Sequence, residues 1–159
     1  MMQRNLPSSV GSLANSMYAL VLHANKISGS IPPEIGNLTN LAFLRMEQNQ
    51  FAGDVPGEIG NLANLIFLNL SQNKLSGRIP LSIGKLRRLM RLLLQDNNLS
   101  GPIPSTLGDC NSLITLNLSC NALNESIPKE LSSTLTPYQK VSICPTTSFL
   151  GRFHMRLVA

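Results

Sequence analysis

Tryptophan is absent from this sequence, and aromatic residues make up only 4% of its 159 residues. Large rings therefore cannot fill a hydrophobic core, so leucine and isoleucine have to build it. Charged residues are also few, at 13% against 43% hydrophobic residues, and this ratio excludes a disordered, strongly solvated chain. We expect a chain that folds around aliphatic side chains.

Long apolar runs are absent as well. No stretch approaches the roughly eighteen uncharged apolar residues that a transmembrane helix needs. Residues 1–7 contain no apolar run of the kind found in signal peptides. In the chain as given we therefore expect neither a signal peptide nor a membrane span, and no membrane insertion by this chain.

Cysteine and histidine are too few and too widely separated for a metal site. The three cysteines, Cys110, Cys120 and Cys144, form no Cys-x-x-Cys pair and no Cys/His ligand spacing. We expect no metal and no other cofactor. His23 has no acid or nucleophile at a useful spacing, so a solvated strand residue is favoured over a catalyst.

The net charge of +5 does not identify a partner, because the thirteen cationic residues are spread over the whole chain. No basic stripe with interleaved aromatic residues accompanies the charge, so we expect no nucleic-acid partner. The densest basic group comprises Lys85, Arg87, Arg88 and Arg91. Its offsets favour a solvated surface over a binding patch.

An internal repeat dominates the chain. Asparagine recurs every 24 residues, at Asn25, Asn49, Asn73, Asn97 and Asn121. Each asparagine ends the pattern Leu-x-x-Leu-x-Leu-x-x-Asn, in which methionine replaces one leucine in each of the first two copies. A segment of the type Leu-Ser-Gly-x-Ile-Pro follows each asparagine, although the copy that begins at Leu123 lacks the glycine.

The alternating leucines of each copy predict a short strand with one buried face. One such strand cannot bury that face alone, but copies stacked about 4.8 Å apart form a parallel sheet over a common aliphatic core. The recurrent asparagine then bridges the backbone of neighbouring copies at the turn that follows the strand, and these residues are structural. Gly29, Gly53, Gly77 and Gly101 favour a positive φ or a close approach, and the prolines that follow stop a helix.

These features predict an α/β solenoid with short parallel strands on the concave face of an arc and 3₁₀ or extended segments on its convex side. We expect little true α-helix. The expected organisation is a partial repeat at 1–13, five 24-residue repeats at 14–133 and a divergent tail at 134–159. In the tail the strand pattern is lost, and proline stands at position 145, where the next asparagine is due.

Residues 6–131 resemble the ectodomain repeats of plant leucine-rich-repeat receptor-like kinases, whose unit reads LxxLxxLxLxxNxLSGxIPxxLGx. Residues 26–38, KISGSIPPEIGNL, resemble the immune-receptor subfamily that senses microbial products. The resemblance implies an extracellular solenoid at the plasma membrane, on a single-span protein with a cytoplasmic Ser/Thr kinase. Its partners would be a peptide or protein ligand and a co-receptor ectodomain.

By this resemblance we expect the chain to correspond to a middle slice of such a receptor. Residues 134–159 contain no Gly-rich phosphate loop, HRD-type loop or DFG motif, so we expect no enzyme activity. The paired-cysteine cap of the family is also missing. A secreted repeat protein of the polygalacturonase-inhibitor type and a non-functional remnant with exposed ends are the alternatives.

Alternation along the strands also predicts which side chains face a ligand. Three columns should line the concave face: Ala19, Phe43, Phe67, Arg91 and Thr115; Val21, Arg45, Asn69, Leu93 and Asn117; and His23, Glu47, Ser71, Gln95 and Ser119. Because aromatic and arginine side chains often anchor interfaces, we expect ligand contacts from six residues. These are Phe43, Arg45, Phe67, Asn69, Arg91 and Leu93. Alternatively, these residues only tolerate solvent, or Phe43 and Phe67 pair across neighbouring strands.

Two further residue types carry expectations. The five Asn-x-Ser/Thr sequons lie at Asn37, Asn69, Asn98, Asn117 and Asn124. They are candidate glycosylation sites that favour a secreted parent, although an Asn- and Ser-rich repeat also produces sequons by chance. Cys110 takes a leucine position of the repeat, so we expect a buried and inert thiol, whereas Cys120 beside the asparagine turn could be accessible.

Overall fold

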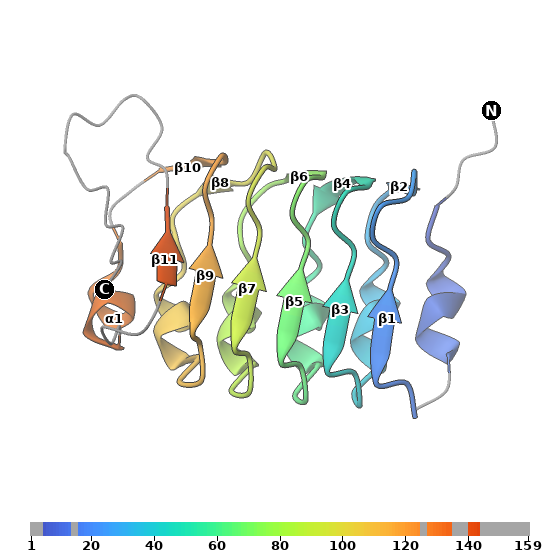
Figure 1. Ribbon diagram of the computed structural model, residues 1–159, viewed down its shortest axis with the longest axis horizontal. Coiled ribbons are helices and arrows are strands. Elements are labelled where there is room, and N and C mark those ends of the chain that lie inside the picture. Colours follow the sequence, from blue (N-terminus) through green and yellow to red (C-terminus); the bar gives the residue numbers. More distant parts are fainter. Residues whose placement is uncertain (1–4, 14–15, 125–126, 135–139, 144–159) are drawn as a thin grey trace.

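Each complete repeat forms one coil of a solenoid, with a three-residue strand, an extended side segment and a short 3₁₀ helix (Figure 1). The computed structural model describes residues 5–13, 16–124, 127–134 and 140–143. The leading strands of the coils form a six-stranded parallel sheet on the concave face, in the order β1-β3-β5-β7-β9-β11. These strands are β1 (Ala19–Val21), β3 (Phe43–Arg45), β5 (Phe67–Asn69), β7 (Arg91–Leu93), β9 (Thr115–Asn117) and β11 (Lys140–Ser142).

The core lies directly behind this sheet. The central leucine of each leading strand from β1 to β9 stands opposite its counterpart in the next strand, so that Leu44, Leu68 and Leu92 lie in one column. All three have 0% of their surface exposed. Full burial of a leucine side chain contributes about 2 kcal/mol, and every coil repeats it. The predicted core of stacked aliphatic side chains is therefore confirmed.

The convex side carries a row of 3₁₀ helices, as the sequence predicted. They are η1 (Ser8–Ser12), η2 (Pro33–Asn37), η3 (Gly57–Asn61), η4 (Leu81–Lys85) and η5 (Ser105–Asp109). A proline in extended conformation precedes each of η2 to η5. Because proline has no backbone N–H, it cannot continue the hydrogen bonding of the extended segment before it. Each helix packs against the next one along the solenoid.

The extended side segments pair with one another and form two further sheets, which the sequence pattern did not reveal. One sheet contains β2 (Ser28–Gly29), β4 (Gln50–Asp54) and β6 (Lys74–Ser76), and the other contains β8 (Ser100–Gly101) and β10 (Ala122–Leu123). The recurrent glycines of these segments have φ angles between 69° and 81°, which confirms the expected positive φ.

The recurrent asparagines form a ladder at the turns. The Asn97 Nδ2 donates to the carbonyl oxygens of Leu70 in the preceding coil and Leu94 in its own, at 3.0 and 3.1 Å. Its Oδ1 accepts from the backbone N–H of Leu75 at 3.0 Å. Asn49, Asn73 and Asn121 make the equivalent three contacts. One side chain thus satisfies backbone groups of two coils.

The last coil departs from the repeat. An α-helix, α1 (Lys129–Thr134), packs against η5 where a 3₁₀ helix would follow. Strand β11 pairs with β9, with Lys140 opposite Thr115, a separation of 140 − 115 = 25 residues. We expected neither a strand nor an α-helix here; the free edge of β9 explains the strand, because unpaired N–H and C=O groups accept any extended segment within reach. Residues 135–139 and 144–159 of the tail lie outside the described residues.

Cys110 lies inside this core, in the column that Leu38, Leu62 and Leu86 occupy in earlier coils. Its side chain is buried, and its Sγ lies 3.3 Å from the carbonyl oxygen of Ile83. Burial raises the pKa of the Cys110 thiol from 9.0 to about 11. The thiolate population at neutral pH is therefore small, which agrees with the expected inert thiol. Cys120 is exposed.

The raised pKa of Cys110 predicts a loss of stability in alkaline solution. The native state holds the neutral thiol more strongly than the unfolded state does, so its contribution is complete below pH 9.0 and disappears as pH rises through about 11. We expect the free energy of unfolding to fall by up to about 2 to 3 kcal/mol over this range. Urea unfolding at a series of pH values measures it.

The matched control is Cys110→Leu, which restores the residue of the three preceding coils. This variant keeps every other ionisable side chain but lacks this thiol. The difference in unfolding free energy between the two proteins should therefore change between pH 9.0 and about 11. A difference that stays constant with pH contradicts the prediction.

Candidate ligand-binding surface

The concave sheet brings the six expected contact residues onto one face. Phe43 stands opposite Phe67, and Phe67 stands opposite Arg91. In the second column, Asn69 stands between Arg45 and Leu93. The two columns are therefore adjacent, but their exposure differs. Arg91 is exposed, Phe43, Phe67, Arg45 and Leu93 are half-buried, and Asn69 is buried.

The aromatic contact on this face joins Phe43 to Tyr18. Their ring centroids are 5.3 Å apart and the ring planes meet at 63°, an edge-to-face arrangement. Tyr18 precedes β1 and retains 60% exposure, so the pair presents a ring surface to solvent. Strand alternation alone does not place Tyr18 on this face.

The residue just before each leading strand adds an apolar column that sequence reasoning missed. The backbone ladder runs through these positions, with the N–H of Ile66 bonded to Ala42, that of Met90 to Ile66 and that of Ile114 to Met90. Met90 and Ile114 are 39% and 42% exposed. Together with Phe43 and Phe67 of the first strand column they form an edge that we call the apolar rim. It comprises Tyr18, Phe43, Ile66, Phe67, Met90 and Ile114.

The opposite half of the concave sheet is polar, and several of its side chains bond one another. The guanidinium of Arg45 forms an ion pair with Glu47, and its Nε donates to Oε1 at 2.9 Å. The Glu47 side chain is only 8% exposed, whereas that of Arg45 is 41% exposed. A buried carboxylate thus compensates the charge of Arg45. Among the described residues, Glu47 Oε2 and Gln95 Oε1 are buried without a hydrogen-bond partner.

Asn69 is held in place by its own strand end. Its Oδ1 accepts from the Ser71 N–H at 3.1 Å and from the Ser71 hydroxyl at 2.7 Å. Asn117 and Ser119 repeat this arrangement two coils later. These two sequon asparagines therefore lie on the sheet with their oxygens occupied, whereas Asn37, Asn98 and Asn124 are exposed.

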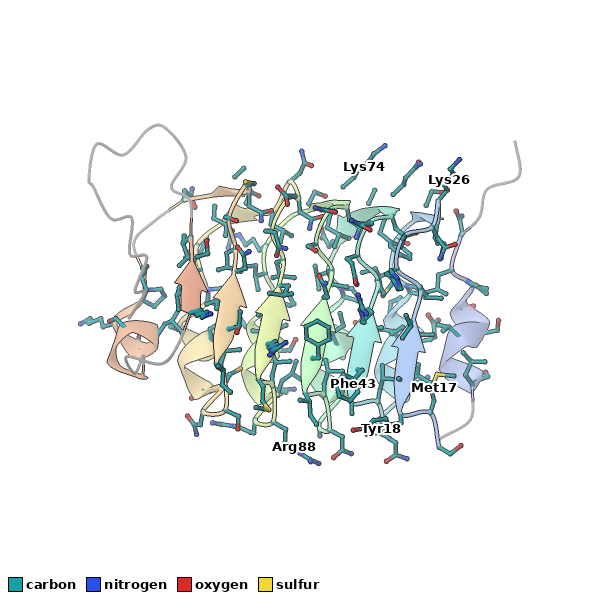
Figure 2. The ribbon with its side chains drawn as sticks, viewed as in Figure 1. Met17, Tyr18, Lys26, Phe43, Lys74 and Arg88 are labelled. Atoms are coloured by element: carbon teal, nitrogen blue, oxygen red, sulfur yellow. The ribbon has the colours of Figure 1, made fainter. Side chains whose placement is uncertain are left out.

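Three arginines, Arg87, Arg88 and Arg91, lie at the end of the sheet where β7 begins. Arg88 Nη1 donates to the neutral Asn64 Oδ1 at 2.8 Å. Arg87 Nη1 donates to the Asp109 carbonyl oxygen at 2.8 Å and lies 3.8 Å from its carboxylate. Figure 2 shows Arg88 and Tyr18 at the lower edge, with Phe43 on the sheet above them, and Lys26 and Lys74 at the upper edge. The apolar rim and Arg88 therefore share one edge.

No cluster that could hold a metal ion occurs within residues 5–13, 16–124, 127–134 and 140–143. In the same part of the chain, no helix is long and apolar enough to cross a bilayer.

A family model described as a leucine-rich repeat region matches residues 20–146. A search of curated proteins finds no match.

Solved structures of plant receptors resemble the chain closely. The ectodomain of the membrane receptor kinase GASSHO1/SCHENGEN3 from Arabidopsis thaliana, in complex with CASPARIAN STRIP INTEGRITY FACTOR 2, is 39% identical over 89% of this chain, with a TM-score of 0.82. The Arabidopsis receptor kinase HAESA, in complex with the peptide hormone IDA and the co-receptor SERK1, is 34% identical over 89% of this chain, with a TM-score of 0.76. The chain spans 16% and 23% of the lengths of these two receptors.

A shorter relative is spanned more fully. The BIR2 ectodomain from Arabidopsis thaliana is 31% identical over 79% of this chain, with a TM-score of 0.69, and the chain covers 68% of it.

Proposed function

Since this chain belongs to the leucine-rich repeat family, we propose that it is a peptide- or protein-binding module from the ectodomain of a plant receptor-like Ser/Thr kinase. In this proposal the parent protein lies at the extracellular face of the plasma membrane and takes part in signal perception. A role in defence, a co-receptor ectodomain as a second partner and glycosylation at exposed sequons belong to the same proposal.

The apolar rim is the observation that carries the proposal. Soluble proteins seldom expose several large apolar side chains side by side, and such patches mark interaction sites. Tyr18, Met90 and Ile114 are exposed by 60%, 39% and 42%, although each lies within one residue of a well-packed strand. Two similar solved ectodomains are complexes with CASPARIAN STRIP INTEGRITY FACTOR 2 and with the peptide hormone IDA, which supports a peptide as the ligand class.

The proposed activity is binding rather than catalysis. The leucine-rich repeat fold is a non-catalytic scaffold in the similar ectodomains. Several polar side chains of this face bond one another: Asn69 bonds Ser71, and Glu47 pairs with Arg45. A nucleophile next to a base is needed for covalent catalysis, and these pairs do not provide one.

Selection of a random peptide-display library on the full chain tests this function. Phe67→Ala should weaken the binding of the enriched peptides about tenfold, because Phe67 lies at the centre of the apolar rim. Isothermal titration with the synthetic peptides gives the dissociation constants.

The matched control is Leu81→Ala. Leu81 is an exposed apolar residue, at 68%, but it lies in η4 on the convex side. Binding that falls equally in both variants reflects general adhesion to apolar surface, and it would contradict a ligand site on the concave sheet.

A further inference from the structure

We propose that the ligand is an anionic peptide that crosses the strands in an extended form, with apolar residues on the apolar rim and an acidic group against Arg88 and Arg91. This inference rests on the proposed function and specifies the chemical class of its ligand.

The charges on the concave side point to an anion. Arg45 is paired with the buried carboxylate of Glu47, so its charge is already compensated. Among the described residues, Arg88 bonds only a neutral amide oxygen, that of Asn64, and Arg91 is exposed two coils away from Glu47. Arg87, which precedes them, pairs with Asp109, whereas no ion pair of Arg88 or Arg91 occurs within the described ranges of the chain. Uncompensated positive charge therefore remains at this edge.

The apolar side chains favour a peptide over a nucleic acid. Arg91 is followed across the sheet by Phe67 and Phe43, and Met90 beside it is 39% exposed. A nucleic acid requires a basic stripe that follows its backbone. Lys26 and Lys74 could not extend such a stripe, because they lie at the opposite edge of the molecule (Figure 2).

The geometry also sets an approximate length and direction. Strands of a sheet lie about 4.8 Å apart, so the path from Tyr18 beside β1 to Ile114 beside β9 spans roughly 19 Å. An extended peptide rises about 3.3 Å per residue and needs about six residues for this distance. The aromatic side chains lie toward β1, the arginines lie at β7, and Ile114 lies beyond them beside β9. The apolar residues of the ligand should therefore flank its acidic group, with the longer apolar block on the β1 side.

Selection of a random dodecamer display library on the full chain provides the probe. We expect the enriched peptides to combine aspartate or glutamate with a block of apolar residues. The variant Arg88→Ala/Arg91→Ala should bind them about tenfold more weakly, and wild-type affinity should fall as salt is raised. Lys26→Ala/Lys74→Ala removes the same charge at the opposite edge and should change affinity less than about twofold. All four side chains are exposed, so circular dichroism should show unchanged folding.

Three results would overturn the inference in distinguishable ways. Enriched peptides that lack acidic residues, or that bind the double arginine variant as well as the wild type, refute the anionic ligand but leave the proposed function intact. Binding of a single-stranded oligothymidine that exceeds peptide binding and depends on the same arginines points to a nucleic acid instead. If no enriched peptide is sensitive to Phe67→Ala, the proposed function itself fails.

Discussion

Replacement of Gly60 by alanine is expected to lower the free energy of unfolding by about 3 kcal/mol, the cost of overpacking a rigid contact. A Cβ at Gly60 would lie 2.6 Å from the carbonyl oxygen of Ser82 and 2.6 Å from its Cβ. Ser82 belongs to η4, whose backbone is held by the next coil in the same way. The next coil therefore cannot move away from Gly60 without disturbing the coils stacked behind it.

Gly57 supplies the matched control within the same 3₁₀ helix, η3. An added Cβ there would approach Ser82 only at its Oγ, at 3.8 Å, which is an ordinary van der Waals distance. Gly57→Ala should therefore change stability by less than about 1 kcal/mol, and reduced freedom of the unfolded chain makes a small gain possible. Urea unfolding followed by circular dichroism compares the two variants, and equal losses would show that the coils are not in close contact at Gly60.

The sequence shows that glycine recurs every 24 residues at Gly36, Gly60 and Gly84, but the close contact that makes these glycines critical comes from the structure. Cβ atoms at Gly36 and Gly84 would each lie 2.4 Å from a carbonyl oxygen of the next coil. The period and the strand alternation also predicted the parallel sheet, the aliphatic core and the 3₁₀ helices, since all of these follow from stacking identical units. Helix α1 and strand β11 break the period, so the repeat could not predict them.

The apolar rim shows why the binding surface was predicted only in part. Alternation assigns the residue before each strand to the buried face, and Ala42 follows this rule with 2% exposure. Tyr18 and Met90 do not follow it, because the sheet ends there and larger side chains extend past its edge. Alternation did place Arg45 and Glu47 on the same face, two residues apart, but the neutralisation of Arg45 became evident only from the ion pair. The six expected contacts remain a prediction that the binding experiments above address.

Replacement of Asn97 by alanine should also destabilise the fold by about 3 kcal/mol. The change removes the donor to the Leu70 and Leu94 carbonyl oxygens and the acceptor of the Leu75 N–H. Leu70 and Leu75 are both buried, so water cannot easily replace the lost partners. Each buried polar group left without a hydrogen bond costs about 1 to 3 kcal/mol. Thermal and urea unfolding measure the loss.

Asn25 is the matched control, because it is the first asparagine of the same ladder and is exposed. Within the part of the chain that the structure describes, its Nδ2 bonds only the carbonyl oxygens of Leu22 and His23 in its own turn. Both acceptors remain within reach of solvent after Asn25→Ala, so we expect a loss below about 1 kcal/mol. The two variants should differ because Asn97 bonds the backbone of two coils, whereas the bonds of Asn25 lie within its own turn. If Asn25→Ala and Asn97→Ala were equally damaging, the asparagines would act through the shape of their own turns, and the ladder between coils would contribute little to holding the solenoid together.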